Sequence, residues 1–89
     1  MKAVLTVIGV DQVGIIAKIT AVLAENGVNI HDITQTIMQD LFTMIMLVDT
    51  DKSNKDIDGI SEELTKLSDE IGVEIRIQHQ GIFNSMHRI

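Results

Sequence analysis

The sequence contains no cysteine. This absence excludes a disulfide framework, a thiolate nucleophile and every zinc, iron–sulfur or heavy-metal site that depends on sulfur ligands. The core of this 89-residue chain must therefore be held by aliphatic packing alone. A chain that has no need of disulfides suits a reducing compartment, and we expect a cytoplasmic protein.

Aromatic residues, positive charges and long apolar runs are also scarce. Two phenylalanines, with no tyrosine or tryptophan, leave no stacking platform for single-stranded RNA. The net charge of −6, with acidic residues concentrated in residues 49–74, disfavours contact with a phosphate backbone. No apolar run approaches the roughly 18 residues of a membrane span, and the run at residues 3–8 is too short for a signal peptide. We therefore expect neither nucleic acid nor a membrane as a partner.

The first half of the chain has strand, helix and strand patterns in succession. Residues 2–9 are apolar on both faces, which predicts a strand in the interior of a sheet. Residues 14–26 carry apolar side chains at helical spacing, and Gly27 stands where a left-handed C-cap would end that helix. Residues 28–39 alternate loosely, with polar side chains on both faces, and we expect an edge strand there.

The second half repeats this order. Residues 41–48 are apolar on both faces and predict a second interior strand. Asp56 and Asp58 fall in the expected first turn of a helix, where the dipole favours negative charge, and Gly72 is its expected C-cap. Residues 73–78 alternate apolar and polar, as in a half-buried strand, so the second edge of the sheet is expected here.

Two βαβ halves therefore lie end to end, and their junctions match as GVNI at residues 27–30 and GVEI at residues 72–75. This order predicts an α+β, ferredoxin-like split βαβ fold, βαββαβ, with both helices on one face of a four-stranded antiparallel sheet. We expect one domain over residues 1–79. Residues 80–89 would form a short amphipathic tail that packs on the domain or on a dimer partner through Ile82, Phe83, Met86 and Ile89.

Only the first half has a glycine-flanked turn between strand and helix. The turn at residues 9–14 puts exposed backbone N–H groups at a helix start, and Asn29 is the polar strand residue expected near them. Asp11 could cap the helix by accepting from the N–H of Val13 or Gly14, or it could face a ligand amine. An anion is the less suitable ligand beside Asp11, because anion-binding helix starts normally offer their N–H groups unoccupied.

Gly14 and Asn29 each allow a structural interpretation as well. Gly14 could serve only the turn or the packing, and Asn29 could simply be solvated. The histidines His31, His79 and His87 fall on different elements, with no carboxylate or thiol at regular spacing, so we expect surface histidines and no metal. No cofactor is expected either.

One set of residues carries a family resemblance. It consists of G-x-D-x-x-G-I-I at residues 9–16, LAENG at 23–27, VNI at 28–30, and Gln35, Phe42 and Met44. With this set the chain resembles, over about residues 2–79, the ACT domain, a small-molecule-sensing module of enzymes and regulators of amino-acid metabolism. As a free-standing copy it is most similar to the short bacterial ACT proteins, grouped with the glycine-cleavage-repressor-type and formyltetrahydrofolate-deformylase-type ACT domains.

The resemblance implies side-by-side pairing of two domains through their second strands, with an effector amino acid between strand two of one copy and the turn before helix one of the other. It assigns Asn29 to a ligand hydrogen bond and Gly14 to the close approach of backbone and ligand. Serine-binding members place histidine and asparagine where this chain has Gly9 and Asp11, so a serine-type effector is not expected. The candidate ligand-binding residues are Val10, Asp11, Gln12, Val13, Gly14, Asn29 and Ile30.

Three functions follow as hypotheses. The first is a homodimeric regulatory module that binds an amino acid or related metabolite and acts on a metabolic enzyme or regulator. The second is an assembly module without a ligand. The third is an acylphosphatase-like enzyme, which needs an arginine in a phosphate cradle after the first strand, whereas the only arginines are Arg76 and Arg88. The expectation is therefore a protein without catalytic residues.

Overall fold

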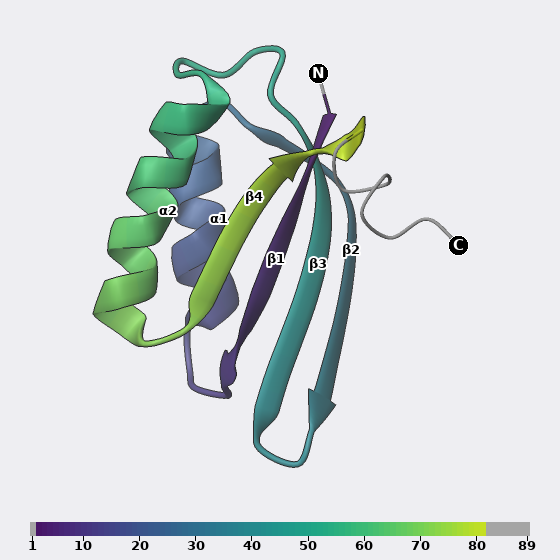
Figure 1. Cartoon of the computed structure of the whole chain (residues 1–89), viewed down its shortest axis with the longest axis vertical. Coiled ribbons are helices and arrows are strands. Elements are labelled where there is room, and N and C mark those ends of the chain that lie inside the picture. The colour runs from purple at the N-terminus through teal and green to yellow at the C-terminus, as the bar shows by residue number, and fades with distance from the viewer. Residues whose placement is uncertain (1, 82–89) are drawn as a thin grey trace.

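The computed structural model describes residues 2–81. Its elements are, in order, β1 (Lys2–Val10), α1 (Ile15–Glu25), β2 (Asn29–Met38), β3 (Leu41–Asp49), α2 (Ile57–Ile71) and β4 (Glu74–His79). Both helices lie on the same side of a single sheet (Figure 1). The order βαββαβ confirms the predicted ferredoxin-like α+β fold.

The sheet has the strand order β2-β3-β1-β4, and all neighbouring strands are antiparallel. β1 and β3 lie inside the sheet and β2 and β4 form its edges, which confirms the predicted positions of all four strands. Asn29 pairs with Asp49, which pairs with Lys2 at one end of the sheet, whereas Val10 pairs with Leu41 at the other end. β2 therefore begins where β1 begins.

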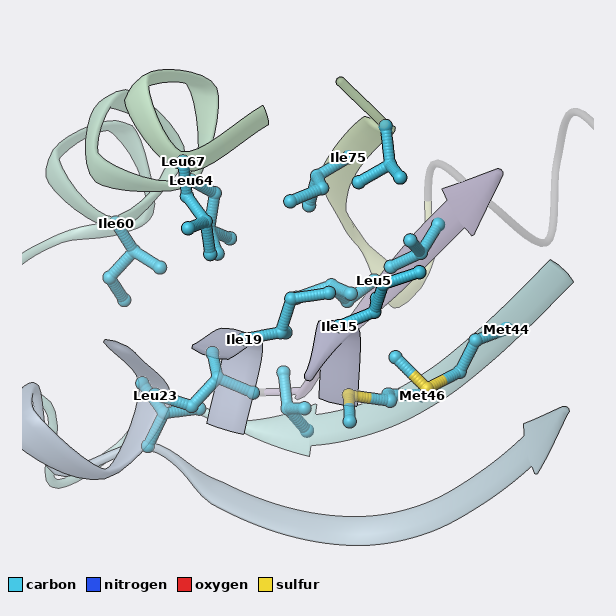
Figure 2. Packing of buried hydrophobic residues seen from close by; sticks show 14 of the residues in the cluster. Leu5, Ile15, Ile19, Leu23, Met44, Met46, Ile60, Leu64, Leu67 and Ile75 are labelled. Atoms are coloured by element: carbon cyan, nitrogen blue, oxygen red, sulfur yellow. The ribbon is translucent and has the colours of Figure 1, made fainter. Parts of the chain in front are cut away.

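The core lies between the helices and the inward side chains of the sheet (Figure 2). The inward positions of β1 and β3 alternate with outward ones, as a half-covered sheet requires. Burial of each such aliphatic side chain stabilises the fold by roughly 1.5–3 kcal/mol. The largest side chains that are less than 2% exposed are Leu5, Ile19, Leu23, Met44, Met46, Ile60 and Leu64, together with Val7 and Val48.

The two helices end alike and begin differently. Gly27, after the α1 cap residue Asn26, and Gly72, at the end of α2, have φ angles of 73° and 71°, so the expected left-handed ends are confirmed. At the start of α2 the Asp56 carboxylate accepts from the N–H of Gly59 at 2.9 Å. The placement of Asp56 in the first turn was therefore wrong: its backbone is extended, its side chain is the cap, and only Asp58 lies in that turn.

Neither helix within residues 2–81 is long and apolar enough to cross a membrane. Residues 80 and 81 are helical. The apolar positions of the expected tail, residues 82–89, lie outside the described residues, so the prediction of a docked tail stays a prediction.

Candidate functional site

The turn between β1 and α1 is held on both sides. The backbone N–H of Asp11 donates to the carbonyl of Asp40 at 2.8 Å, which joins this turn to the β2–β3 hairpin. The side-chain amide of Gln12 donates to the carbonyl of Ile71 at 2.7 Å and so joins the turn to the end of α2. Gln12, one of the predicted ligand residues, thus has a structural bond.

The start of α1 is left open. Gly14 occupies the N-cap position with a φ of 89°, and no side chain caps the helix. The N–H of Lys18 donates to the Gly14 carbonyl at 3.0 Å, whereas the amides of residues 15–17 precede the first intrahelical bond. The expected capping by Asp11 is wrong, because a cap side chain reaches the second or third residue after itself and α1 begins only at Ile15.

A hollow of about 480 Å³ lies beside this helix start, and we call it the turn hollow. Turn and helix residues form one wall and strand residues of β2 and β3 form the other. Polar groups of the turn and the strand thus face an aliphatic and aromatic floor. The lining residues are Asp11, Gln12, Gly14, Ile15, Ile16, Ala17, Gln35, Ile37 and Phe42.

A second hollow, of about 580 Å³, lies at the other end of β2, and we call it the Asn29 hollow. A β-bulge between Ile30 and Asp32 shapes this end of the strand. The imidazole Nε2 of His31 lies 3.5 Å from a carboxylate oxygen of Asp49. The lining residues are Gly27, Asn29, His31, Asp49, Asp51 and Lys52. Among residues 2–81 no three histidine or acidic side chains gather as a metal site requires.

The structure does not bring the predicted ligand residues together within one chain. The turn follows Val10, whereas Asn29 is level with Lys2, eight residues earlier in β1. Eight residues of strand span about 26 Å. The separation arises because β2 starts beside the end of α1, while the turn leads into its beginning. Val10 and Val13, 67% and 100% exposed, project at the turn, and Ile30, 36% exposed, lies at the opposite end.

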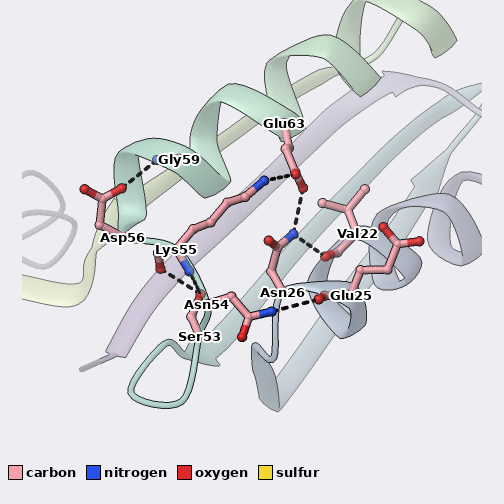
Figure 3. A network of polar contacts seen from close by, with 9 residues as sticks. All are labelled: Val22, Glu25, Asn26, Ser53, Asn54, Lys55, Asp56, Gly59 and Glu63. Carbon is pink, nitrogen blue, oxygen red and sulfur yellow. Dashed lines mark hydrogen bonds and ion pairs between the residues drawn. The ribbon is translucent and has the colours of Figure 1, made fainter.

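A polar network joins the end of α1, the loop before α2 and α2 itself (Figure 3). Asn26 is only 4% exposed, and its side-chain amide donates to the Val22 carbonyl at 2.8 Å and to Glu63 at 2.7 Å. The Lys55 ammonium pairs with the other Glu63 carboxylate oxygen. Hydrogen bonds from Lys55 and Asn26 lower the pKa of Glu63 below its ordinary value of 4.5. The network fastens the end of α1 to α2.

The whole of β2 is exposed. Its isoleucines Ile30, Ile33 and Ile37 are 36%, 41% and 52% exposed, although they pair with the buried Val48, Met46 and Phe42 of β3. They thus continue the inward apolar rows of the sheet beyond the cover that the helices provide. The sequence predicted an edge strand at residues 28–39, and the exposure of β2 confirms that prediction.

Comparison with known proteins identifies this arrangement. A family model described as ACT domain matches residues 2–78. A UPF0237 protein of Methanococcus maripaludis is 58% identical over 88 residues, which make up 99% of this chain and 98% of that protein. The structure of an ACT domain protein from Streptococcus pneumoniae superposes with a TM-score of 0.81 at 38% identity and covers 93% of both chains.

Larger proteins contain the same fold as one part. A formyltetrahydrofolate deformylase from Pseudomonas syringae matches with a TM-score of 0.80 at 27% identity, over 88% of this chain and 27% of that one. The regulatory subunit of aspartate kinase from Thermus thermophilus, in a ligand-free form, matches with a TM-score of 0.68 at 30% identity, over 86% of this chain and 50% of that subunit. The resemblance inferred from residues 9–16 and their companions is confirmed: the chain belongs to the ACT domain family, and its relatives include the UPF0237 proteins.

Proposed function

We propose that this chain is a regulatory module that forms a homodimer through β2 and binds an amino acid or related metabolite between the two copies. The observation that carries the proposal is the position of the two hollows at opposite ends of one exposed edge strand. A two-fold axis that pairs two β2 edges antiparallel sets the start of one strand beside the end of the other. Asn29 of one copy then approaches the turn hollow of its partner.

The chemistry of β2 supports such pairing. Among residues 2–81 no strand pairs with its outer edge, whose backbone groups a second β2 would satisfy with main-chain hydrogen bonds. Ile30, Ile33 and Ile37 are exposed on the helix side, and a partner sheet removes part of their surface from water. Two four-stranded sheets would thereby become one continuous sheet with all helices on the same face.

The groups at the combined site suit a zwitterion. The uncapped start of α1 offers backbone N–H groups and the positive end of the helix dipole to a carboxylate. The Asp11 carboxylate lines the same hollow and suits an ammonium group. Asn29 of the other copy can donate to and accept from the ligand. The apolar floor around Ile37 and Phe42 leaves space for a small or aliphatic side chain.

ACT domains are in general regulatory modules that bind small molecules, and one matched structure is the regulatory subunit of an enzyme. We extend this role to the present chain, with a metabolic enzyme or regulator as its partner and the cytoplasm as its location. The arginine that an acylphosphatase needs is not at the turn within residues 2–81, because Arg76 lies on the β4 edge with its guanidinium 2.6 Å from Glu74. This observation favours a binding module over that enzyme.

The test begins with calorimetric titration of the twenty amino acids into the full chain, with light scattering to measure its mass. Asp11→Asn and Asn29→Ala should each abolish the binding that the native chain shows, because every site in either homodimer lacks one contact. Asp58→Asn, on the exposed first turn of α2, removes an equal charge away from β2 and serves as the control.

A mixture of the two variants separates a shared site from two independent ones. A mixed dimer has one site with both native residues and one site with neither, and about half of the dimers are mixed after exchange, so about a quarter of the sites should recover. If the mixture shows no heat of binding although the subunits are verified to have exchanged, a site built from two copies is contradicted. A dimer that binds none of the twenty amino acids would instead favour the assembly module.

A further inference from the structure

One side chain of β2 departs from the apolar pattern of its row. The side chains of this strand that lie on the helix side of the sheet pair with buried residues of β3, and they are Ile30, Ile33, Gln35 and Ile37. Gln35 pairs with Met44, which is fully buried, so an aliphatic side chain would satisfy the packing at this position. Proteins depart from such local patterns mainly at functional sites. This departure marks Gln35 as a candidate for ligand contact.

Gln35 lines the turn hollow with its polar groups unused. Within residues 2–81 its side chain makes no hydrogen bond, whereas the other amide in the same hollow, that of Gln12, donates to the Ile71 carbonyl at 2.7 Å. The Gln35 amide thus keeps its N–H donors and its carbonyl acceptor for a ligand. It belongs to the strand wall of the hollow, and Asp11 and the start of α1 belong to the other wall.

We propose that the effector has a neutral carboxamide side chain, as glutamine and asparagine do, and that Gln35 determines this specificity. The inference rests on the proposed function, in which the start of α1 binds the effector carboxylate and Asp11 binds its ammonium group. With both charged groups at the turn, the effector side chain extends to the strand wall. Its methylene groups then lie on the apolar floor at Ile37 and Phe42, and its amide meets that of Gln35.

A second carboxamide is the group that matches both ends of the Gln35 amide. Two amides side by side form two hydrogen bonds, in which each donates an N–H to the carbonyl of the other. An ammonium side chain can only donate, and a hydroxyl offers a single atom for both roles. An aliphatic side chain leaves the Gln35 amide without partners once the effector excludes water, and one such unsatisfied group weakens binding by about five- to 150-fold.

A carboxylate side chain is disfavoured for a second reason. The carboxylate of Asp11 lines the same hollow, and the chain has a net charge of −6. Like charges repel more strongly where a second copy of the chain excludes water. Glutamine and glutamate have nearly the same shape, so their affinities should report this difference in charge directly.

Calorimetric titration of the full chain tests the specificity with L-glutamine, L-asparagine, L-glutamate, L-methionine and L-serine as probes. Methionine has about the length of glutamine without its amide, so this pair isolates the contribution of the amide hydrogen bonds. We expect glutamine or asparagine to bind about tenfold or more tightly than each of the other three.

Gln35→Met keeps the length of the side chain and removes its donors and its acceptor. This substitution should weaken binding of the carboxamide effector about tenfold and bring methionine to equal or tighter binding. Thr36→Val is the matched control, because Thr36 follows Gln35 in β2 and faces the other side of the sheet, and it should keep the native order of affinities. Circular dichroism and light scattering verify that both variants keep the native fold and mass.

The outcomes separate this inference from the proposed function. Tightest binding of glutamate, methionine or serine would overturn carboxamide recognition and leave an amino-acid-binding module in place. A preference for glutamine or asparagine that survives Gln35→Met would overturn the role of Gln35. Absence of binding by any of the twenty amino acids would overturn both this inference and the proposed function.

Discussion

Alanine at Gly27 should destabilise the protein more than alanine at Gly72, although both glycines end a helix in the same conformation. Their φ angles are 73° and 71°, so both substitutions carry the same left-handed strain of roughly 1–2 kcal/mol, partly offset by a less flexible unfolded chain. At Gly72 a new Cβ would contact nothing within 4 Å. We therefore expect Gly72→Ala to lower the free energy of unfolding by about 1 kcal/mol.

At Gly27 the same Cβ would lie 2.8 Å from the carbonyl oxygen of Lys52 and 3.7 Å from the Cα of Ser53. These are backbone atoms, so relief requires movement of the whole loop. That loop is fastened by the N–H of Asn54, which donates to the Asn26 carbonyl at 2.9 Å. Loss of this bond adds about 1 kcal/mol, and the total for Gly27→Ala should reach about 2–3 kcal/mol.

Urea unfolding of both variants, followed by circular dichroism at one protein concentration, measures the two free energies of unfolding. Gly72→Ala is the matched control, since it contains the same side chain at the same φ in the repeated junction. Equal losses in the two variants would refute the reasoning, because they would mean that the loop at Lys52 yields to a methyl group without cost.

Three further predictions concern other parts of the molecule. Ile33→Asp places a charge in the proposed β2 interface and should leave a folded monomer by light scattering; a dimer of unchanged mass would contradict that interface. Because Lys55 lowers the pKa of Glu63, this carboxylate stabilises the fold fully above about pH 4.5 and loses the effect as the pH falls below that value. The difference in unfolding free energy between native chain and Glu63→Gln should therefore shrink in acid, and a difference that stays constant from pH 7 to pH 3 would contradict this role of Glu63. Gln12→Ala removes the bond to the end of α2 and should cost about 1 kcal/mol in urea unfolding.

The fold could be predicted because its determinants are local or periodic. Apolar residues on both faces of residues 2–9 and 41–48 marked the interior strands, and alternation marked the edge at residues 73–78. The matching junctions around Gly27 and Gly72 were sufficient to divide the chain into two halves. Each of these signals depends on side-chain period or backbone conformation, which neighbouring residues determine.

The candidate site was harder to predict from the sequence, because it depends on where helices and strands distant in the chain meet. Asn29 and the turn are close in sequence order but belong to opposite ends of α1, and only the register of β2 reveals the distance between them. Asp11 resembled a cap because it is acidic and precedes a helix, yet the left-handed Gly14 delays the helix start. The bond between Asn26 and Glu63 joins residues 37 positions apart, and no periodicity signals such a pair.

The exposed strand β2 has a consequence for the amount of protein that a cell must maintain. Native edge strands are usually protected against unwanted pairing by lysine, proline or a covering element. Asn29–Met38 contains neither lysine nor proline. If a second copy is the main protection of the strand beyond the bulge between Ile30 and Asp32, the free energy of unfolding rises with protein concentration, and a dilute chain exposes a template for other strands. Abundance itself then becomes part of the stability of this protein.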